Sequence, residues 1–334
     1  MNPHVKELLD RSLFEPMRDF KCRRGKRIRS SLLQISYEMA GGIDKVPASV
    51  SDAIESLHAG SLVIDDVQDD SRSRRGRVTL HQSIGVPLAI NAGNWMYFHA
   101  LECLSNSPLP DEIRSRLIEA MIHTGRRCHE GQAIDIHARV DQVPVEYWEV
   151  TTSSISLMKT GSLVELAVRM GCIAANASDR LLSVLPVLGR RLGIALQMRN
   201  DLDELTSIAQ LQREDQSEDL IRDDDLRNAR MTWPWVWASQ YTEHARCREW
   251  AMRLDRSSQD RRDVAKELFQ LVGDHGDQII GAVVSEQLRL LAEHVIVRRF
   301  LDAIGEILQT IERPSWPVLT HEEIHANQTS EVAR

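Results

Sequence analysis

The stretch LVIDDVQDDSRSRRG, residues 62–76, places an apolar run directly before four aspartates and a basic turn. On a helix, residues i and i+4 lie on one face and residue i+1 lies about 100° away, so Asp65, Asp66 and Asp69 would present three carboxylates to one point. Such like charges destabilise a helix by roughly a few tenths of a kcal/mol per pair. A solvated acidic face is one interpretation, but the apolar residues just upstream indicate a buried helix. Buried acids of this kind need a cation to balance them.

A second acidic cluster has the same spacing farther along the chain. The sequence QMRNDLDE, residues 197–204, follows an apolar helical segment and offers Asn200, Asp201 and Glu204 at i, i+1 and i+4. Two oxygen-rich faces on buried helices can converge in the core of a bundle. Such oxygens suit Mg²⁺, which keeps several waters and is commonly completed by phosphate groups. The pair of clusters therefore predicts a magnesium site.

Apolar residues recur at helical spacing along most of the chain, whereas alternating strand-like runs bounded by hairpin turns are hard to find. Glycine and proline breaks separate segments of roughly 15–30 residues. These segments predict an all-α fold, a single large helical bundle over residues 1–313. Residues 314–334 include two prolines and turn polar, so we expect a loosely packed polar tail there.

Composition argues against several classes of protein. The 334-residue chain has a net charge of −8, which argues against a general nucleic-acid binder, although a local basic patch can still hold a small anion. Its five cysteines are scattered and never in a CxxC spacing, so we expect neither a disulfide framework nor a zinc site. No stretch approaches ~18 uninterrupted apolar residues, and the N-terminus has no apolar signal region. We therefore expect a cytoplasmic protein with no transmembrane segment.

Basic residues supply the other half of a polyphosphate site. They occur in GKRIR at 25–29, in RRG at 74–76, in KT at 159–160 and at Arg230. Lysine and arginine donate charged hydrogen bonds to phosphate oxygens, although any one of them alone would more often be a surface charge. Their combination with two acidic clusters predicts a site for a magnesium-bound polyphosphate.

Together these motifs resemble the trans-isoprenyl diphosphate synthases of the polyprenyl synthetase family. The family's order and approximate spacing are matched by GKRIR (25–29), LHAGSLVIDDVQDDSRSRRG (57–76), TLHQSIGVPLAINAGNW (79–95), GQAIDI (131–136), KTGSL (159–163) and QMRNDLDE (197–204). The resemblance covers about residues 20–235. It implies an isoprenoid-synthase bundle with a central substrate cavity, usually a homodimer, that joins isopentenyl diphosphate to an allylic diphosphate.

The resemblance also implies a role for each matching position. Two Mg²⁺ ions would be held by Asp65, Asp66 and Asp69, and a third by Asn200, Asp201 and Glu204. The allylic diphosphate would be contacted by Arg74, Lys159, Gln197 and Arg230. The diphosphate of isopentenyl diphosphate would be bound by Lys26, Arg29, His58 and Arg75. The allylic cation would be steadied by the oxygen dipoles of Thr160 and Gln197.

In this family, residues one turn before the first aspartate form the floor of the hydrophobic pocket that sets product length. Here they are Gly60 and Ser61, both small, so we expect a product longer than fifteen carbons. Tyr97, Phe98 and His129 resemble the floor of geranylgeranyl diphosphate synthases, although they could equally be ordinary core aromatics. We therefore expect a twenty-carbon product, with twenty-five carbons as the next alternative.

Departures from the family pattern leave other functions open. The second motif is usually DDxxD, and an asparagine such as Asn200 also begins the second metal motif of class I terpene cyclases. The residues that would continue that cyclase motif are missing, because Glu204 and Ile208 stand there. A terpene cyclase or unusual prenyl-coupling enzyme on the same fold is one alternative, and a non-catalytic partner subunit is another. We expect Asp70 and the acidic run 223–225 to be solvated.

Overall fold

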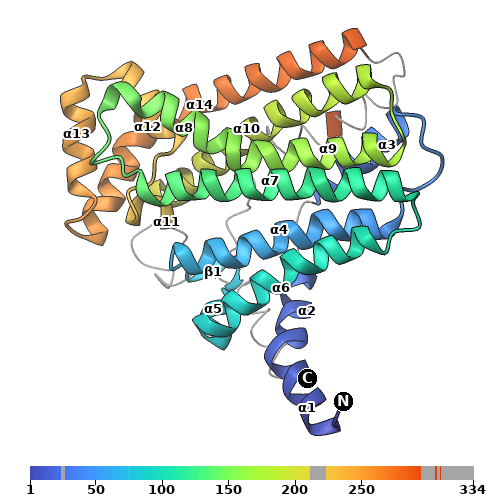
Figure 1. The fold of residues 1–334 in the computed structure, drawn as a ribbon. Coiled ribbons are helices and arrows are strands. Elements are labelled where there is room, and N and C mark those ends of the chain that lie inside the picture. The colour runs from blue at the N-terminus through green and yellow to red at the C-terminus, as the bar shows by residue number, and fades with distance from the viewer. Residues whose placement is uncertain (24–26, 75, 211–222, 295–304, 307–308, 310–334) are drawn as a thin grey trace.

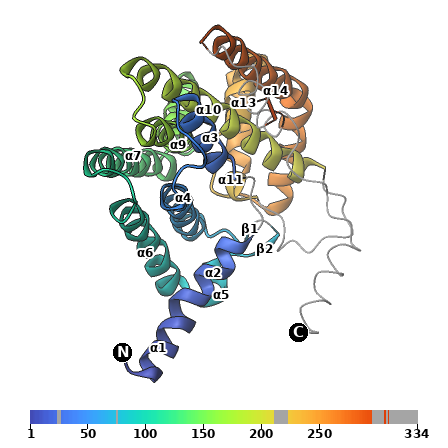
Figure 2. The same ribbon diagram turned by 90° about the vertical axis from the view of Figure 1, so that its right-hand side faces the viewer.

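Long helices lying side by side make up most of the computed structural model, as Figure 1 and Figure 2 show. The structure describes residues 1–23, 27–74, 76–210, 223–294, 305, 306 and 309. The all-α bundle predicted from the sequence is confirmed. The tail expected at 314–334 lies outside the described residues, so the boundary at residue 313 stays a prediction.

The helical elements follow one another with short connections. Their bounds are α1 Pro3–Leu9, a π-helical turn Asp10–Phe14, α2 Glu15–Cys22, α3 Ile28–Met39, α4 Ala48–Gln68, α5 Leu80–Ile84, α6 Val86–Ser105, α7 Asp111–His137, a 3₁₀ turn Val145–Tyr147, α8 Trp148–Ser156, a π-helical segment η3 Leu157–Gly161, α9 Ser162–Ala174, α10 Asp179–Ala209, α11 Asp224–Arg227, α12 Trp233–Tyr241, α13 His244–Arg253 and α14 Ser258–His294. The main breaks coincide with glycine and proline positions, where helix continuation is unfavourable.

A short β-hairpin follows α4, and nothing in the sequence pattern predicts it. Strands β1, Ser73–Arg74, and β2, Arg77–Val78, pair antiparallel over two residues each. The turn between them contains Gly76 at φ +72°, a left-handed conformation that glycine adopts without steric cost. The hairpin is too short to show an alternating pattern, yet it turns the chain sharply after the acidic cluster.

The end of α4 explains why the first acidic cluster keeps helical spacing. The backbone N–H of Asp69 still donates to the carbonyl of Asp65 at 2.9 Å, although Asp69 is the first residue beyond the helix. The next residue, Asp70, has φ +50°, and Ser71 N–H closes the turn onto the carbonyl of Asp66 at 2.9 Å. Such a left-handed residue ends a helix because it redirects the chain.

Three apolar clusters hold the bundle together. The largest joins α8, α9, α10, α12 and α14 and contains the fully buried pair Trp148 and Trp235, whose rings meet edge to face at 5.9 Å. A second packs α3, α4 and α6 on α7 and α9, and a third seats the N-terminal helices on α4 and α6. Fully burying one large apolar side chain contributes roughly 1.5–3 kcal/mol. These contacts fix the two helices, α4 and α10, that carry the acidic clusters.

Helix α10 is the one described helix that is long and apolar enough to cross a membrane, judged by length and composition alone. Half of its most apolar window is buried inside the protein, where α10 packs between α9 and α14. Leu202 and Leu205 on this helix belong to the largest apolar cluster. We therefore interpret α10 as a core helix of the bundle.

Candidate active site

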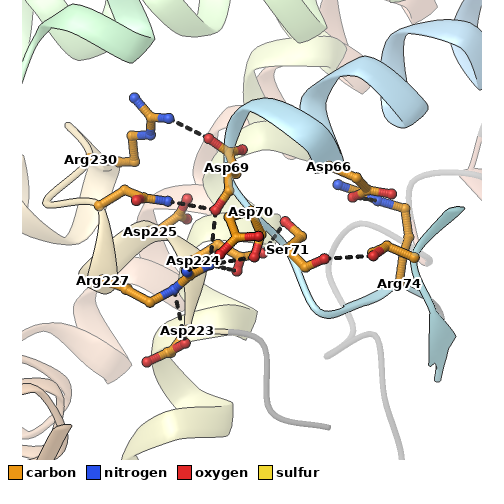
Figure 3. Close-up of polar contacts among 12 residues, drawn as sticks. Asp66, Asp69, Asp70, Ser71, Arg74, Asp223, Asp224, Asp225, Arg227 and Arg230 are labelled. Carbon is orange, nitrogen blue, oxygen red and sulfur yellow. Dashed lines mark hydrogen bonds and ion pairs between the residues drawn. The ribbon is translucent and has the colours of Figure 1, made fainter. Parts of the chain in front are cut away.

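Arg74 joins the first two aspartates of the first cluster. Its Nε donates to Oδ1 of the fully buried Asp66 at 2.5 Å, and its Nη2 donates to Oδ2 of Asp65 at 3.2 Å. Figure 3 shows Arg74 beside Asp66 on the side of the cluster where the hairpin lies. The hairpin is therefore what returns an arginine to the end of α4.

Asp69 is held by a different arginine. Arg230 donates from Nη2 to Oδ1 of Asp69 and from Nη1 to the carbonyl of Asp135 at 2.8 Å. In Figure 3 the side chain of Asp69 points to Arg230, away from the Asp66–Arg74 pair. The expectation that three carboxylates meet at one point is thus only partly correct, because arginines from different sides draw Asp66 and Asp69 apart.

Lys159 and Gln132 close the site around Asp65. Lys159 Nζ lies 3.6 Å from Asp65 Oδ1 and donates to Oδ2 of Asp135. Gln132 Nε2 donates to the same Asp65 oxygen at 3.1 Å. Neither Gln132 nor Asp135 was assigned a role from the sequence. The signal was present in GQAIDI, since residues i and i+3 share one face of a helix.

The charges of this cluster are strongly interdependent. Burial, and then repulsion from Asp65, raise the pKa of Asp69 to about 6, although Arg230 opposes the shift. Burial works against the charge of Lys159, but Asp135 and Asp65 outweigh it and raise its pKa, so the ammonium stays protonated. The site therefore combines one acid, Asp69, whose charged form is disfavoured by burial, with a lysine that remains charged.

The second acidic cluster is centred on Asp201, which is 5 % exposed. Its Oδ1 accepts from Gln197 Nε2 at 2.7 Å, and its Oδ2 accepts from the backbone N–H of Trp233 at 3.0 Å. Burial, and then repulsion from Asp225, raise the pKa of Asp201 well above its usual range. Both of these hydrogen-bond donors are neutral, so neither balances the charge of the carboxylate.

The other two predicted ligands of the second cluster lie in different surroundings. Asn200 is exposed, whereas the adjacent Asp201 is buried, because neighbouring helical residues point about 100° apart. Glu204 accepts from the backbone N–H of Asp225 at 2.8 Å and so holds the start of α11. Asp201 and Glu204 line one small pocket together with Asp225, whereas Asn200 is exposed, so their role as a common set of metal ligands stays a prediction.

A close helix approach brings the mid-chain motif to the second cluster. Lys159 and Thr160 lie on the π-helical segment η3, a distortion frequent at functional sites. A Cβ on Gly193 would lie 2.7 Å from Gly161 Cα and 2.8 Å from the carbonyl of Thr160, so only glycine permits this approach. One turn later on α10, Gln197 Oε1 accepts from Thr160 Oγ1 at 2.5 Å.

The predicted site for isopentenyl diphosphate is described in part. Arg29 on α3 and His58 on α4 lie side by side, with Nη1 of the arginine 3.1 Å from Nε2 of the histidine. Lys26 and Arg75, the other two predicted ligands, lie outside the described residues. A contact from Ser30 to Glu55 joins the same two helices. The structure thus brings together the two members of this set that it describes.

The small residue Gly60 faces a helix rather than open space. A Cβ there would lie 2.8 Å from the carbonyl of Gly93 and 3.1 Å from Tyr97 Cδ1, so α4 and α6 approach closely at this point. Ser61 is half-buried and its Oγ donates to the carbonyl of His58 at 2.8 Å. The ring of Tyr97, rather than a cavity, therefore occupies the volume next to Gly60.

Two of the predicted pocket aromatics are in contact and one is not. Tyr97 meets His129 edge to face with ring centroids 5.7 Å apart, and burial followed by Asp65 raises the pKa of Tyr97. Phe98 is 73 % exposed, so its assignment to the pocket is wrong within this chain. The reason is helical geometry, since consecutive residues of α6 face different sides.

The acidic run 223–225 is not a solvated loop. Asp224 is 4 % exposed and accepts from Ser71 Oγ at 2.5 Å, and the N–H of Asp225 is bound by Glu204. The prediction failed because two of the contacting residues, Ser71 and Glu204, come from distant parts of the sequence. The side chain of Asp70 is exposed, as predicted.

The donors around the site fit a hard divalent cation. Within the described ranges, no three His, Cys, Asp or Glu side chains converge closely enough to form a complete metal cage. Mg²⁺ does not need one, because it is usually bound by one or two carboxylates with water and phosphate oxygens. Asp65, Asp69 and Asp201 would supply those carboxylates. The pKa values of Asp69 and Asp201 are raised by burial and then by a neighbouring acid, and a bound cation would offset both effects.

Comparison with known proteins identifies relatives of similar sequence. A short chain isoprenyl diphosphate synthase of Methanothermobacter thermautotrophicus is 33 % identical over 185 residues, 55 % of each chain, so the match spans only about half of that relative. A geranylgeranyl pyrophosphate synthase of Eremothecium gossypii is 30 % identical over 237 residues, covering 69 % of this chain and 70 % of that one.

The fold is shared with solved structures. The crystal structure of geranylgeranyl pyrophosphate synthase from Corynebacterium glutamicum, complexed with isoprenyl diphosphate and magnesium, superposes with a TM-score of 0.75 at 23 % identity and covers 90 % of each chain. The family model for polyprenyl synthetase matches residues 10–272. The resemblance read from the sequence motifs is confirmed, and the chain belongs to the polyprenyl synthetase family.

Proposed function

We propose that this protein is a Mg²⁺-dependent trans-prenyltransferase that condenses isopentenyl diphosphate with an allylic diphosphate. The observation that carries the proposal is the convergence of Arg74, Lys159 and Arg230, from three separate segments, on the acids Asp65, Asp66, Asp69 and Asp135. A site that combines carboxylates for Mg²⁺ with several fixed cations suits a diphosphate. The similarity to isoprenyl and geranylgeranyl diphosphate synthases supports the same substrate class.

The cations of the site have two possible partners. Each of Arg74, Lys159 and Arg230 is already paired with a carboxylate, so a ligand that takes over the carboxylates leaves these cations for phosphate oxygens. Bound Mg²⁺ would neutralise the departing diphosphate and so favour ionisation of the allylic C–O bond. Fixed charges of this kind stabilise a leaving group without reorganising during the reaction.

The second cluster would stabilise the organic cation. Thr160 Oγ and Gln197 Oε1 are oriented by the chain of hydrogen bonds from Thr160 through Gln197 to Asp201. Their oxygen dipoles would lie near the allylic cation, which the π bond of isopentenyl diphosphate attacks to form the new C–C bond. The released diphosphate would then take up the proton that restores the double bond. Arg29 and His58 would hold the diphosphate of the attacking unit.

We infer a twenty-carbon product. Tyr97 supports this length because its ring fills the space beside Gly60 and contacts His129, closing the end of the α4–α6 face. The similarity to the geranylgeranyl pyrophosphate synthase of Eremothecium gossypii supports the same product length. Twenty-five carbons stays the alternative, since Gly60 and Ser61 are both small.

One assay tests the proposal. The full chain is incubated with Mg²⁺, isopentenyl diphosphate and each allylic diphosphate in turn, and products are identified by mass. Consumption of isopentenyl diphosphate with formation of a twenty-carbon diphosphate is the expected result. A hydrocarbon formed from an allylic diphosphate alone would instead support the cyclase alternative. No turnover with any substrate would support a non-catalytic partner subunit.

We also infer a homodimer. Helix α6 exposes four apolar side chains, Val86, Leu88, Ile90 and Phe98, and exposed apolar surface suits contact with a second copy of the chain. Sedimentation of Phe98→Arg against the unaltered chain tests this, with a shift to monomer expected. All five cysteines are free, which supports the cytoplasmic setting that we infer from the sequence.

A further inference from the structure

The turn after α4 is clamped by the segment that leads to Arg230. We call the contacts of residues 69–71 with residues 224–228 the latch. Arg227 Nη2 donates to the carbonyls of Asp69 at 2.8 Å and Asp70 at 2.9 Å, and to Oδ1 of Asp224 at 2.9 Å. Ser71 Oγ donates to the other oxygen of Asp224 at 2.5 Å. Figure 3 shows Arg227 and Asp224 together against the turn that carries Asp69 to Ser71.

The latch supplies hydrogen-bond donors to backbone carbonyls at the end of α4 that have no partner within the helix. The last carbonyls of a helix have no partner within the helix and carry a partial negative charge. Arg227 is a fixed cation placed across two carbonyls just past that end, and Asn228 Nδ2 adds a bond to the carbonyl of Asp69 at 3.1 Å. Asp70 sits at φ +50°, a conformation that non-glycine residues keep only when their surroundings enforce it.

The same segment connects the two acidic clusters. Glu204 of the second cluster binds the N–H of Asp225 at the start of α11, and Arg230, three residues after Arg227, binds the carboxylate of Asp69. The segment that carries Arg227 is therefore joined to the second acidic cluster through Glu204 and to the first through Arg230. Arg227 touches the backbone of Asp69, whereas Arg230 touches its side chain.

We propose that Arg227, with Asp224 and Ser71, is a positioning residue that sets where the Asp69 carboxylate lies relative to the second acidic cluster, and thereby sets the affinity for divalent cation in the presence of diphosphate. This inference rests on the proposed function, because it assumes that the two clusters hold a magnesium–diphosphate group. Arg227 itself contacts backbone carbonyls and carboxylates of the turn, and acts through Asp69.

A positioning role and a purely electrostatic role of Arg227 predict opposite changes in Mg²⁺ binding when the residue is replaced. A cation near a Mg²⁺ site repels the metal, so removing its charge alone would tighten Mg²⁺ binding. Loss of position would weaken Mg²⁺ binding, because partners that orient metal ligands typically contribute about 10- to 100-fold in metal affinity. The sign of the change in Arg227→Gln therefore separates the two roles.

The experiment measures binding of inorganic pyrophosphate to the full chain by calorimetry at increasing Mg²⁺, without any turnover. We expect Arg227→Gln to raise the Mg²⁺ concentration for half-maximal binding about tenfold. Arg227→Lys keeps the charge but replaces the planar guanidinium by a compact ammonium on a flexible stem, so it should recover only part of that loss. Ser71→Ala removes one hydrogen bond of the latch, from the Ser71 hydroxyl to the Asp224 carboxylate, and should give a smaller loss in the same direction.

Arg190→Gln is the matched control. Arg190 is 30 % exposed, similar to the 25 % of Arg227, and its guanidinium binds Glu165 through two hydrogen bonds of 2.6 and 2.8 Å. It lies ten residues before Asn200 on α10. Its loss removes one guanidinium of comparable burial without touching the latch, so Mg²⁺ dependence should not change.

Hydrogen exchange of a peptide covering residues 67–74, in the ligand-free protein, supplies a second measurement. We expect faster exchange in Arg227→Gln and Ser71→Ala than in Arg190→Gln. Unchanged exchange, or unchanged or tighter Mg²⁺-dependent binding in Arg227→Gln, overturns the positioning role while leaving the proposed function intact. Absence of Mg²⁺-dependent pyrophosphate binding in the unaltered chain overturns both, so the two failures are distinguishable.

Discussion

The two acidic clusters have the same i, i+1, i+4 spacing but opposite electrostatic surroundings. In the first, Asp65, Asp66 and Asp69 are paired with the side chains of Arg74, Lys159 and Arg230. In the second, the oxygens of Asp201 accept from a side-chain amide and a backbone N–H. Spacing therefore predicts which carboxylates share a helix, while the partners that set their charge come from other elements.

This difference changes what each cluster does before a ligand binds. In the first cluster paired cations hold the acids in place in the metal-free protein, although burial and then Asp65 still raise the pKa of Asp69 to about 6. The second holds a buried acid whose pKa is raised well above its usual range by burial and by Asp225. We expect the first cluster to determine whether diphosphate binds productively and the second to tune the reaction.

The largest effect should follow from breaking the first cluster. Asp65→Ala removes the carboxylate that joins Arg74, Lys159 and Gln132, so turnover should fall by roughly 10³-fold or more. Consumption of isopentenyl diphosphate, with circular dichroism to verify folding, measures the loss. Asp274→Ala is the matched control because it removes an aspartate that is exposed on α14 and lies on neither acidic cluster. Near-normal turnover in a folded Asp65→Ala would refute the site assignment.

A smaller loss should follow at the second cluster. Thr160→Val removes the hydroxyl that donates to Gln197 at 2.5 Å, and one such bond corresponds to about a tenfold loss in rate. Steady-state kinetics should show the loss in kcat.

Thr152→Val is the control, since the Thr152 hydroxyl is buried and makes no hydrogen bond within the described residues. This variant should keep full activity, and its free energy of unfolding should equal or exceed that of the unaltered chain. If the two variants lose equal activity, the role given to Thr160 is wrong.

The stability of the metal-free protein should depend on pH through its crowded acids. The pKa of Asp69 rises from 3.8 to about 6, so the folded state binds a proton more tightly than the unfolded state. This contribution is fully present below pH 3.8 and is lost as pH rises through about 6. The free energy of unfolding in EDTA should therefore fall by on the order of 1 kcal/mol from about pH 5 to 7.

Denaturant unfolding at several pH values checks this dependence. Asp201 contributes in the same direction, because its pKa is raised as well. Asp69→Asn should flatten the curve without abolishing it, which separates the contribution of the first cluster from that of the second. A free energy of unfolding that rises across the same pH range would contradict the raised pKa of Asp69.

The most limited effect concerns the pocket beside the first cluster. Tyr97→Ala opens the volume next to Gly60, so products should shift from twenty toward twenty-five carbons while total turnover changes little. Tyr147→Ala is the control, because Tyr147 is a tyrosine that is 56 % exposed and lies on the 3₁₀ turn before α8, rather than on α4 or α6. Mass analysis of the prenyl chains distinguishes them, and an unchanged length in Tyr97→Ala would place the pocket floor elsewhere.

Some of the site was predictable because its signals are local. The aspartates at 65, 66 and 69 follow helical spacing, and the motif order was enough to indicate the family. Asp135 was missed although it shares a helix face with Gln132, since a single aspartate in GQAIDI carries no charge pattern of its own. Asp224 was misassigned because its partner, Ser71, lies 153 positions away in the chain.

By itself, the sequence determined the helical bundle, the two acidic clusters and the family, because all three depend on periodicity and motif order within the chain. Only the tertiary structure decided which cation pairs with which acid, that Gly60 faces α6, that Phe98 is exposed, and that Arg227 clamps the turn after α4. The physical reason is that charge, burial and hydrogen bonding depend on side chains brought together from distant segments, and no local pattern encodes those distances.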